Sequence, residues 1–510
     1  MATRDFLLSR HALLSLIFLI IAVVYYVSFK AKGRYKYPPG PRGLPIFGNL
    51  FQLPPSYPGP QLAKWSEQYG ELFTLQLGST KWVFLNSMKA ARELLDQRGK
   101  LYISRPDFAI TQDVLSGGNR IVMMPYSQRW RNLRKIMHQL LMASNSDTYK
   151  PFQEVESKAL IWELLHRPSE FYLHGARYAN SVIFSVVFGR RTSMRDENVK
   201  LLFSTIDDFM DSQKSPSASL IEQFPWVARK LPKQLQWWRP RAERVFKKTV
   251  GVYASFLDDL ERRVQAGQDP QCFARDMGIL ASKYDFDDAQ KYFCAGSIIE
   301  AGSDTTRNQI NILLAAAAKY PAWVKTAQEH LDKVCGNAER LPGFEDYENL
   351  PYIVAVIKES LRWRPNLTAS GTPRTLIEDD SYKGYNFEKG TVVTYNHFSI
   401  CHDEREFPEN EKFKPERFMN EDLYDLLKGH IGFGAGWHLA TRNMFIAFSR
   451  ILYCFEFAEY ADAPIDDYHI DPLAHYHSPF KIKIAPRSPG HISLIEKECE
   501  QLGKELEMLA

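Results

Sequence analysis

The chain has 510 residues, of which 45% are hydrophobic and 13% aromatic, so it is long enough to bury a large core. Its formal net charge is only +4 and its basic residues are dispersed, which excludes the concentrated basic surface of a nucleic-acid-binding protein. Its six cysteines are isolated, without a Cys-x-x-Cys pair or a histidine pair at metal-ligand spacing, which excludes zinc and iron–sulfur sites and indicates a reducing compartment.

The N-terminus predicts a membrane anchor. Residues 12–29, ALLSLIFLIIAVVYYVSF, carry no charge, and as a helix they span ~27 Å, which roughly matches a hydrocarbon core. A cleaved signal peptide or a buried helix is the weaker alternative, because the run is long for a signal core and no small-residue cleavage site follows. Basic residues are more numerous after the run than before it. We therefore assign the anchor and its basic flank to residues 1–36, with the main body facing the cytosol.

Residues 37–510 are predicted to form one domain, mostly α-helical with small β-sheets. No repeat, low-complexity linker or abrupt change of composition follows the proline-rich tether at residues 38–41. The runs LFTLQLG, KWVFLN, YKGYNFEKGTVVTYNHF and FKIKIAPRS have strand character, residues 147–332 are mostly helical in period, and ISLIEKECEQLGKELEMLA predicts an amphipathic helix. Trp237 and Trp238 in PKQLQWWRPR fit either a loop at a membrane interface or a partly buried loop.

The segment SQRWRNLRK places Trp130 and Arg134 at positions i and i+4 of a helix. An indole N–H and a guanidinium on the same face could bind one carboxylate. A surface helix with a cation–π contact is the alternative explanation.

The segment AGSDTTRNQ, residues 301–309, interrupts an apolar helical run. Gly302 costs roughly 1 kcal/mol relative to alanine there, and Thr305 and Thr306 are unfavourable inside a helix, so a compensating role is expected. A local opening beside an acid and a hydroxyl would admit a diatomic ligand or water and relay protons. By itself the motif is better explained by an ordinary polar helix face.

The segment KESLRWRP places Glu359 and Arg362 on one helix face, close enough to pair. Most such pairs are solvated surface charges. Arg417 in FKPERF is a candidate third member, and a buried network of the three would hold the fold together around a site.

The order of these motifs resembles a known family. An N-terminal anchor followed by PPGPRGLPIFGNL, WRNLR, AGSDTT, KESLR, PERF and FGAG is similar to the membrane-bound cytochrome P450 family of haem-thiolate monooxygenases. The resemblance covers nearly the whole chain. It implies the cytochrome P450 fold with an N-terminal transmembrane helix in the endoplasmic reticulum membrane, haem as cofactor, and NADPH electrons delivered by a flavoprotein reductase. The residue pattern of the segment HDEREFPENEKFKPERF is similar to that of fungal members that act on specialised metabolites.

The resemblance also implies roles for individual residues. Trp130 and Arg134 would contact one haem propionate, and Arg374 in GTPRTL the other. Asp304 and Thr305 match the acid and the alcohol that guide protons. The structural network behind the haem would consist of Glu359, Arg362 and Arg417.

The haem-ligand loop departs from the family pattern, which reads Phe-Gly-x-Gly-x-Arg-x-Cys-x-Gly before a helix. Phe433, Gly434 and Gly436 match the front of the loop, and the residues from Trp437 onward match the helix. By comparison with the family, about six residues are absent between Gly436 and Trp437, among them a propionate-pairing arginine and the cysteine whose electron push favours O–O cleavage.

Two residues near the join could replace the missing ligand. Cys454 lies well inside the following helix and is interpreted as a small core residue. His438 is close in sequence, and imidazole binds haem iron. We favour a plain helix residue at this position, because a shortened loop would have to be remodelled to aim the imidazole. No metal ligand is assigned.

Three functions remain open from the sequence. The chain is a catalytically inactive relative of monooxygenases, or an active enzyme whose sequence omits a short segment through a misplaced splice boundary, or a non-enzymatic membrane-bound haem or ligand-binding scaffold that uses His438. The intact motifs elsewhere favour a recent lesion or a gene-model error over a scaffold. The expected substrate is a hydrophobic small molecule, selected by loops around residues 108–122 and 203–226.

Overall fold

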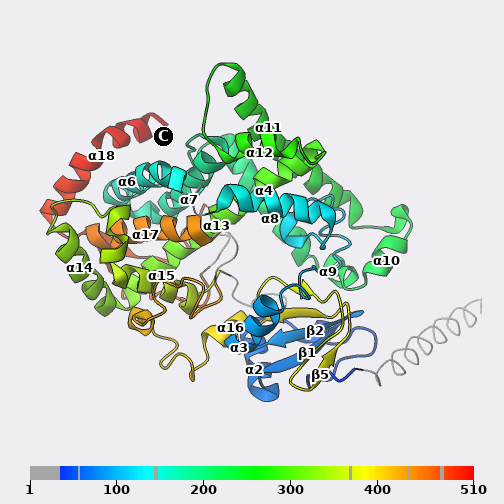
Figure 1. Ribbon diagram of the computed structural model, residues 1–510. Coiled ribbons are helices and arrows are strands. Elements are labelled where there is room, and N and C mark those ends of the chain that lie inside the picture. Colours follow the sequence, from blue (N-terminus) through cyan, green and yellow to red (C-terminus); the bar gives the residue numbers. More distant parts are fainter. Residues whose placement is uncertain are drawn as a thin grey trace, which may run out of the picture. The chain divides into compact units, whose positions relative to one another are not determined.

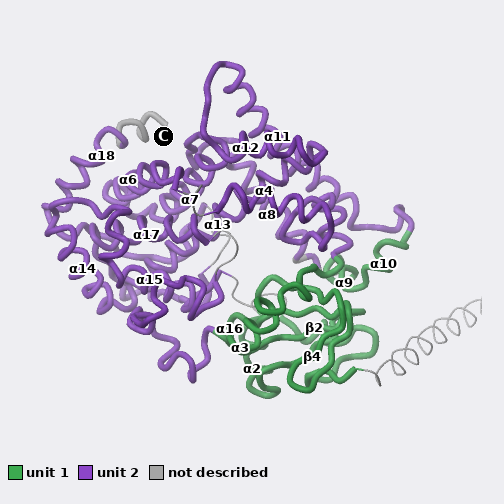
Figure 2. The backbone as a smooth tube through the Cα atoms, in the orientation of Figure 1, with its two compact units in different colours: residues 1–107, 216–231, 369–400 green, residues 108–215, 232–368, 401–510 purple. Residues whose placement is uncertain are grey.

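The computed structural model describes residues 35–54, 58–142, 147–366, 370–432, 437–470 and 476–509. Its backbone divides into two compact units (Figure 2): unit 1 comprises residues 1–107, 216–231 and 369–400, and unit 2 comprises residues 108–215, 232–368 and 401–510. No described helix is long and apolar enough to cross a membrane, and the anchor expected at residues 12–29 lies outside the described ranges.

Unit 1 is built on a four-stranded sheet with the strand order β1-β2-β6-β3, in which β2 and β6 are parallel and the other neighbours antiparallel. Phe73, Leu75 and Phe84 pack in its core against Trp65 of the preceding helix. The elements of this unit are α2 (Gly59–Tyr69), β1 (Leu72–Leu77), β2 (Thr80–Leu85), α3 (Met88–Ala91), α9 (Pro216–Glu222), α10 (Pro225–Lys230), β3 (Arg374–Thr375), the hairpin β4 (Asp380–Tyr382) and β5 (Tyr385–Phe387), β6 (Val392–Tyr395) and α16 (His397–Cys401), whose last residue belongs to unit 2.

Unit 2 is mostly helical (Figure 1), and its strands β7 and β8 form a two-stranded sheet. Its elements are α4 (Gln128–Leu141), α6 (Lys150–His166), α7 (Phe171–Phe188), α8 (Glu197–Lys214), α11 (Arg239–Gln265), α12 (Phe273–Ala281), α13 (Asp288–Lys319), α14 (Pro321–Cys335), α15 (Pro351–Trp363), α17 (Trp437–Cys454), β7 (Phe455–Ala458), β8 (Lys483–Pro486) and α18 (Pro489–Leu509).

The secondary structure expected from sequence periodicity is confirmed. LFTLQLG and KWVFLN form β1 and β2, YKGYNFEKGTVVTYNHF contains β5 and β6, and the C-terminal segments form β8 and α18. A mostly α fold with small β-sheets is therefore correct. Whether residues 37–510 behave as one domain stays a prediction.

The longest helix of unit 2 is α13, with 32 residues. It begins at a capping box, in which the Asp287 side chain accepts a hydrogen bond from the Gln290 backbone N–H while the Gln290 side chain accepts one from the Asp287 N–H, both at 2.7 Å. The α7 and α17 helices pack against it, and residues 306–318 are buried on all sides. The helix continues through residues 301–309 without a break, so the local opening considered for AGSDTT is absent.

Gly302 allows α13 and α7 to approach closely. A Cβ at this position would lie 2.6 Å from Cγ1 of Ile183, which is itself buried. We expect Gly302→Ala to lower the free energy of unfolding by about 1–3 kcal/mol, the range for overpacked cores. Gly251→Ala in α11 is the matched control: open space surrounds that position, so better helix propensity should raise stability by up to about 1 kcal/mol. Urea unfolding compares the two variants, and a stabilised Gly302→Ala would contradict the packing role.

Candidate functional site

Trp130 and Arg134 lie on α4, whose N-terminus is capped by Ser127 accepting a hydrogen bond from the Trp130 backbone N–H at 3.2 Å. The Trp130 ring is half-buried and packs against Tyr126, with ring centroids 5.6 Å apart. The Arg134 side chain is exposed, and no carboxylate in the described ranges forms an ion pair with it. The propionate role of Trp130 and Arg134 stays a prediction.

Asp304 and Thr305 lie in the middle of α13. Asp304 Oδ1 accepts a hydrogen bond from Nη2 of the fully buried Arg307 at 3.1 Å. The exposed Thr305 donates its hydroxyl proton to the Ala301 carbonyl oxygen at 2.6 Å, which explains how a helix interior tolerates a threonine here. The two residues are thus accommodated by local hydrogen bonds, and their proton-guiding role stays a prediction.

The structure brings Glu359, Arg362 and Arg417 into contact. Arg362 donates from Nε and Nη2 to the two oxygens of Glu359 at 2.7 and 2.8 Å, and both side chains are fully buried. Arg417, 58 residues later in the chain, donates from Nε to Glu359 Oε1 at 3.3 Å. The remaining Arg362 nitrogen donates to the Cys401 carbonyl oxygen at 2.8 Å. The donors and acceptors are matched, as a buried ion pair requires.

Arg374 lies in strand β3 of unit 1, beside a second arginine that the sequence analysis did not identify. Arg105 Nη1 donates to the Pro373 carbonyl oxygen at 2.8 Å. Burial, and then the neighbouring charge of Arg374, lower the pKa of Arg105 to about 10. An anion bound near both guanidiniums would relieve this repulsion. Two arginines of unit 1 therefore interact electrostatically, and no spacing pattern marked Arg105 in the sequence. The propionate role of Arg374 stays a prediction.

Unit 2 also contains a largely buried ion pair that no sequence pattern predicted. Glu300 directly precedes the AGSDTT segment, and Arg120 comes from the 108–122 loop, 180 residues earlier. Arg120 Nη1 and the Tyr253 hydroxyl each donate to a Glu300 oxygen, and the guanidinium lies 3.8 Å from the centroid of the Phe209 ring. Arg120 is 4% exposed. In the sequence, this ion pair was indicated by nothing more than the position of Glu300, a carboxylate next to an apolar helical run.

The matching part of the ligand loop, Phe433, Gly434 and Gly436, lies outside the described residues. The helix α17 starts directly after it at Trp437, whose ring stacks on that of His438 with centroids 3.5 Å apart. Burial lowers the pKa of His438, so its imidazole is neutral at physiological pH, the form that binds metals.

Comparison with known proteins decides the family. The cytochrome P450 family model matches residues 38–483. Cytochrome P450 monooxygenase fogE of Aspergillus ruber is 32% identical, over 96% of this chain and 94% of the relative. Cytochrome P450 monooxygenase virE of Hypocrea virens is 33% identical, over 91% of this chain and 88% of the relative. Cytochrome P450 monooxygenase verL of Clonostachys rogersoniana is 34% identical, over 87% of this chain and 85% of the relative. The chain belongs to the cytochrome P450 family. The resemblance drawn from the order of the motifs is confirmed.

This cytochrome P450 lacks the donor with which its family holds haem iron. All six cysteines are buried free thiols, and the two that flank the ligand loop in sequence are Cys401 and Cys454. Burial raises the pKa of Cys401 to about 12 and that of Cys454 still further, so neither is a thiolate at neutral pH. In the described ranges no group of three His, Cys, Asp or Glu side chains could hold a metal ion. The donor set therefore does not fit a haem-thiolate centre.

Proposed function

We propose that the chain as written is a cytochrome P450 without haem-thiolate monooxygenase activity. The donor set carries this proposal, because every cysteine is a buried thiol and none belongs to the ligand loop. The native role of the gene is the oxidation of a hydrophobic small molecule, a secondary metabolite, with dioxygen and with NADPH electrons from a flavoprotein reductase. The similarity to fungal cytochrome P450 monooxygenases supports this role.

The join between Gly436 and Trp437 has two explanations, which predict different transcripts. A real in-frame deletion leaves codons 436 and 437 adjacent, whereas a misplaced splice boundary leaves about six further codons, including a cysteine, in the messenger RNA. Sequencing the full-length transcript across the join distinguishes them. Adjacent codons would support an inactive protein, and additional codons would make the native protein an ordinary haem-thiolate enzyme.

Haem binding through His438 is the second candidate function, favoured by the neutral imidazole at the start of α17. Titration of haem into the purified chain and its His438→Ala variant, followed by absorbance, tests it. We expect equal affinities, because the imidazole is stacked on Trp437. Binding that is about 10-fold or more weaker in His438→Ala would establish the scaffold function in its place.

We propose a single-pass location in the endoplasmic reticulum membrane, with the main domain in the cytosol. The apolar run at residues 12–29 supports the anchor. In unit 2, Leu235 and Trp237 are 59% and 56% exposed whereas Trp238 is buried, which suits a loop with one face at a membrane interface. Flotation of the full chain with vesicles after an alkaline carbonate wash tests the anchor. Full release by the wash would contradict it.

A further inference from the structure

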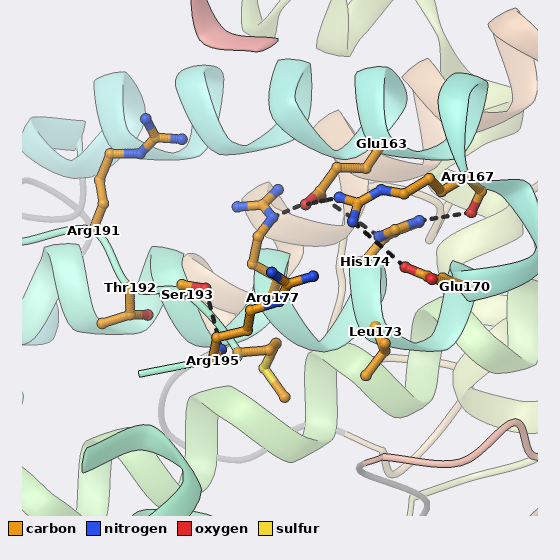
Figure 3. Close-up of a pocket in the computed structure, with 11 residues that line it drawn as sticks. Glu163, Arg167, Glu170, Leu173, His174, Arg177, Arg191, Thr192, Ser193 and Arg195 are labelled. Atoms are coloured by element: carbon orange, nitrogen blue, oxygen red, sulfur yellow. Dashed lines mark hydrogen bonds and ion pairs between the residues drawn. The ribbon is translucent and has the colours of Figure 1, made fainter. Parts of the chain in front are cut away.

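A cavity of about 160 Å³ lies in unit 2, and none of its lining residues has a role assigned above. Figure 3 shows its walls, which come from α6, from the first turns of α7 and from residues 191–195. One water molecule requires roughly 10–15 Å³ of such space, so the cavity admits a polyatomic ligand. Its lining includes four arginines: Arg167, Arg177, Arg191 and Arg195.

Two of these arginines form ion pairs with buried carboxylates. Arg177 is buried, donates from Nε to Glu163 Oε2 at 2.6 Å, and also donates to Glu156. Arg191 Nε donates to the other oxygen of Glu156 at 2.5 Å. These pairs hold α6, α7 and the segment after α7 together.

The other two arginines keep their N–H groups free of carboxylate hydrogen bonds. Arg167 Nη2 lies 3.8 Å from Glu163 Oε1, and Arg167 Nη1 lies 3.6 Å from Glu170 Oε2. These distances are within the range of an ion pair but too long for a hydrogen bond. Arg195 is exposed, and among the described residues no carboxylate lies within ion-pair distance of it. Figure 3 shows both side chains at the cavity. Each guanidinium can therefore offer a pair of parallel N–H donors to one bound anion.

Thr192 and Ser193 add two hydroxyl groups to the lining. Ser193 Oγ accepts the backbone N–H of Arg195 at 3.1 Å, and Thr192 Oγ1 accepts from Asn180 Nδ2 at 3.0 Å, so both hydroxyl protons remain to be donated. Burial lowers the pKa of His174 to about 4, so this lining residue adds no charge at neutral pH.

The charge of the cavity favours an anion. The four arginines carry four positive charges, and the carboxylates of Glu163, Glu170 and Glu156 carry three negative charges. Glu156 lies behind the lining. One positive charge is therefore left uncompensated. The uncompensated charge and the unused donors belong to the lining of the same cavity. A neutral or cationic ligand would leave both unsatisfied.

We infer that this cavity binds a phosphoryl group, either of free phosphate or of a small phosphate ester. Two guanidinium forks and two hydroxyls offer about six donors, more than the roughly four lone-pair sites of a carboxylate accept. A phosphoryl group presents three strong acceptor oxygens and carries roughly −1.5 to −2 charges at neutral pH. It therefore satisfies both the donors and the surplus charge.

The site is connected to the AGSDTT segment by a single side chain. Asn180 on α7 donates to Thr192 of the cavity lining and accepts a hydrogen bond from Ser303 Oγ on α13 at 3.1 Å. The cavity lining contains none of the residues assigned to haem binding. The test of the anion site is therefore independent of the test of the proposed function.

Isothermal titration of the full chain with inorganic phosphate, at constant ionic strength in chloride, tests the assignment. Arg167→Gln and Arg195→Gln are each expected to weaken binding about tenfold or more, a loss of about 1.4 kcal/mol. Both side chains are exposed, so the variants should fold, which circular dichroism checks. Arg262→Gln is the matched control, because this arginine is 74% exposed on α11 and is not part of the cavity.

Three comparisons decide the outcome. No heat of phosphate binding above the chloride background, or an equal loss of binding in Arg262→Gln, would overturn the site. Acetate binding as tightly as phosphate would overturn the choice of a phosphoryl group. Tighter binding of glycerol 3-phosphate than of phosphate supports an ester as the occupant, and the reverse order supports free phosphate.

Discussion

Insertion of the six residues x-Arg-x-Cys-x-Gly between Gly436 and Trp437 is expected to create a thiolate-type absorption band in the reduced, carbon-monoxide-treated protein. The chain as written is expected to show no such band, since its cysteines are buried thiols with raised pKa values. The insertion supplies both the axial donor and the arginine that the family pattern places beside it. The difference between the two proteins should be the presence or complete absence of the band.

The matched control is the same insertion with serine in place of cysteine. It restores the length of the loop without the sulfur ligand, so its spectrum should equal that of the chain as written. A thiolate-type band in the uninserted chain, or monooxygenase turnover by it, would show that the proposed inactivity is wrong. A band in the serine control would show that another residue supplies the ligand.

Removal of one partner from the buried Glu359–Arg362 pair is expected to have the largest effect on stability. Arg362→Met leaves the Glu359 carboxylate fully buried, with only Arg417 at 3.3 Å as a remaining side-chain cation. Breaking a buried pair in this way typically costs about 3–5 kcal/mol. We expect a corresponding fall in the urea midpoint of unfolding, or loss of soluble protein.

Two further variants make this prediction specific. Replacing both partners, with Glu359→Leu added to Arg362→Met, should recover part of the loss because no buried carboxylate then remains unpaired. Lys291→Met removes the cation from an exposed pair of the same spacing, Asp288–Lys291, and should change stability by less than about 1 kcal/mol. If Arg362→Met costs no more than Lys291→Met, the network is not a stabilising element of the fold.

Local patterns in the sequence predicted the helices and strands well. The strands β1 and β2 follow from the strand character of LFTLQLG and KWVFLN, and the helices between residues 147 and 332 follow from helical periodicity. Such patterns depend on neighbours two to four residues apart. For AGSDTT, an ordinary helix was the favoured explanation by residue pattern alone and a local opening the weaker one, and the helix is regular there. Gly302 does not open α13; it receives Ile183 of α7, and no local pattern reveals a partner on another helix.

In the candidate site, too, the sequence predicted local pairing, and the fold decided burial and contacts between distant segments. The i, i+3 spacing predicted that Glu359 and Arg362 could pair, but only the fold shows that the pair is buried and that Arg417 joins it. The neighbours Arg105 and Arg374, and the pair Arg120 and Glu300, are brought together by chain segments far apart in sequence.

The sequence by itself determined the family, through the order of its motifs, and the absence of the ligand cysteine, because both are properties of the covalent chain. The tertiary structure alone decided which charges are buried, which arginines gather around a cavity, and that no remaining cysteine is positioned to ionise. Burial and charge pairing depend on contacts between distant segments, and these arise only when the chain packs.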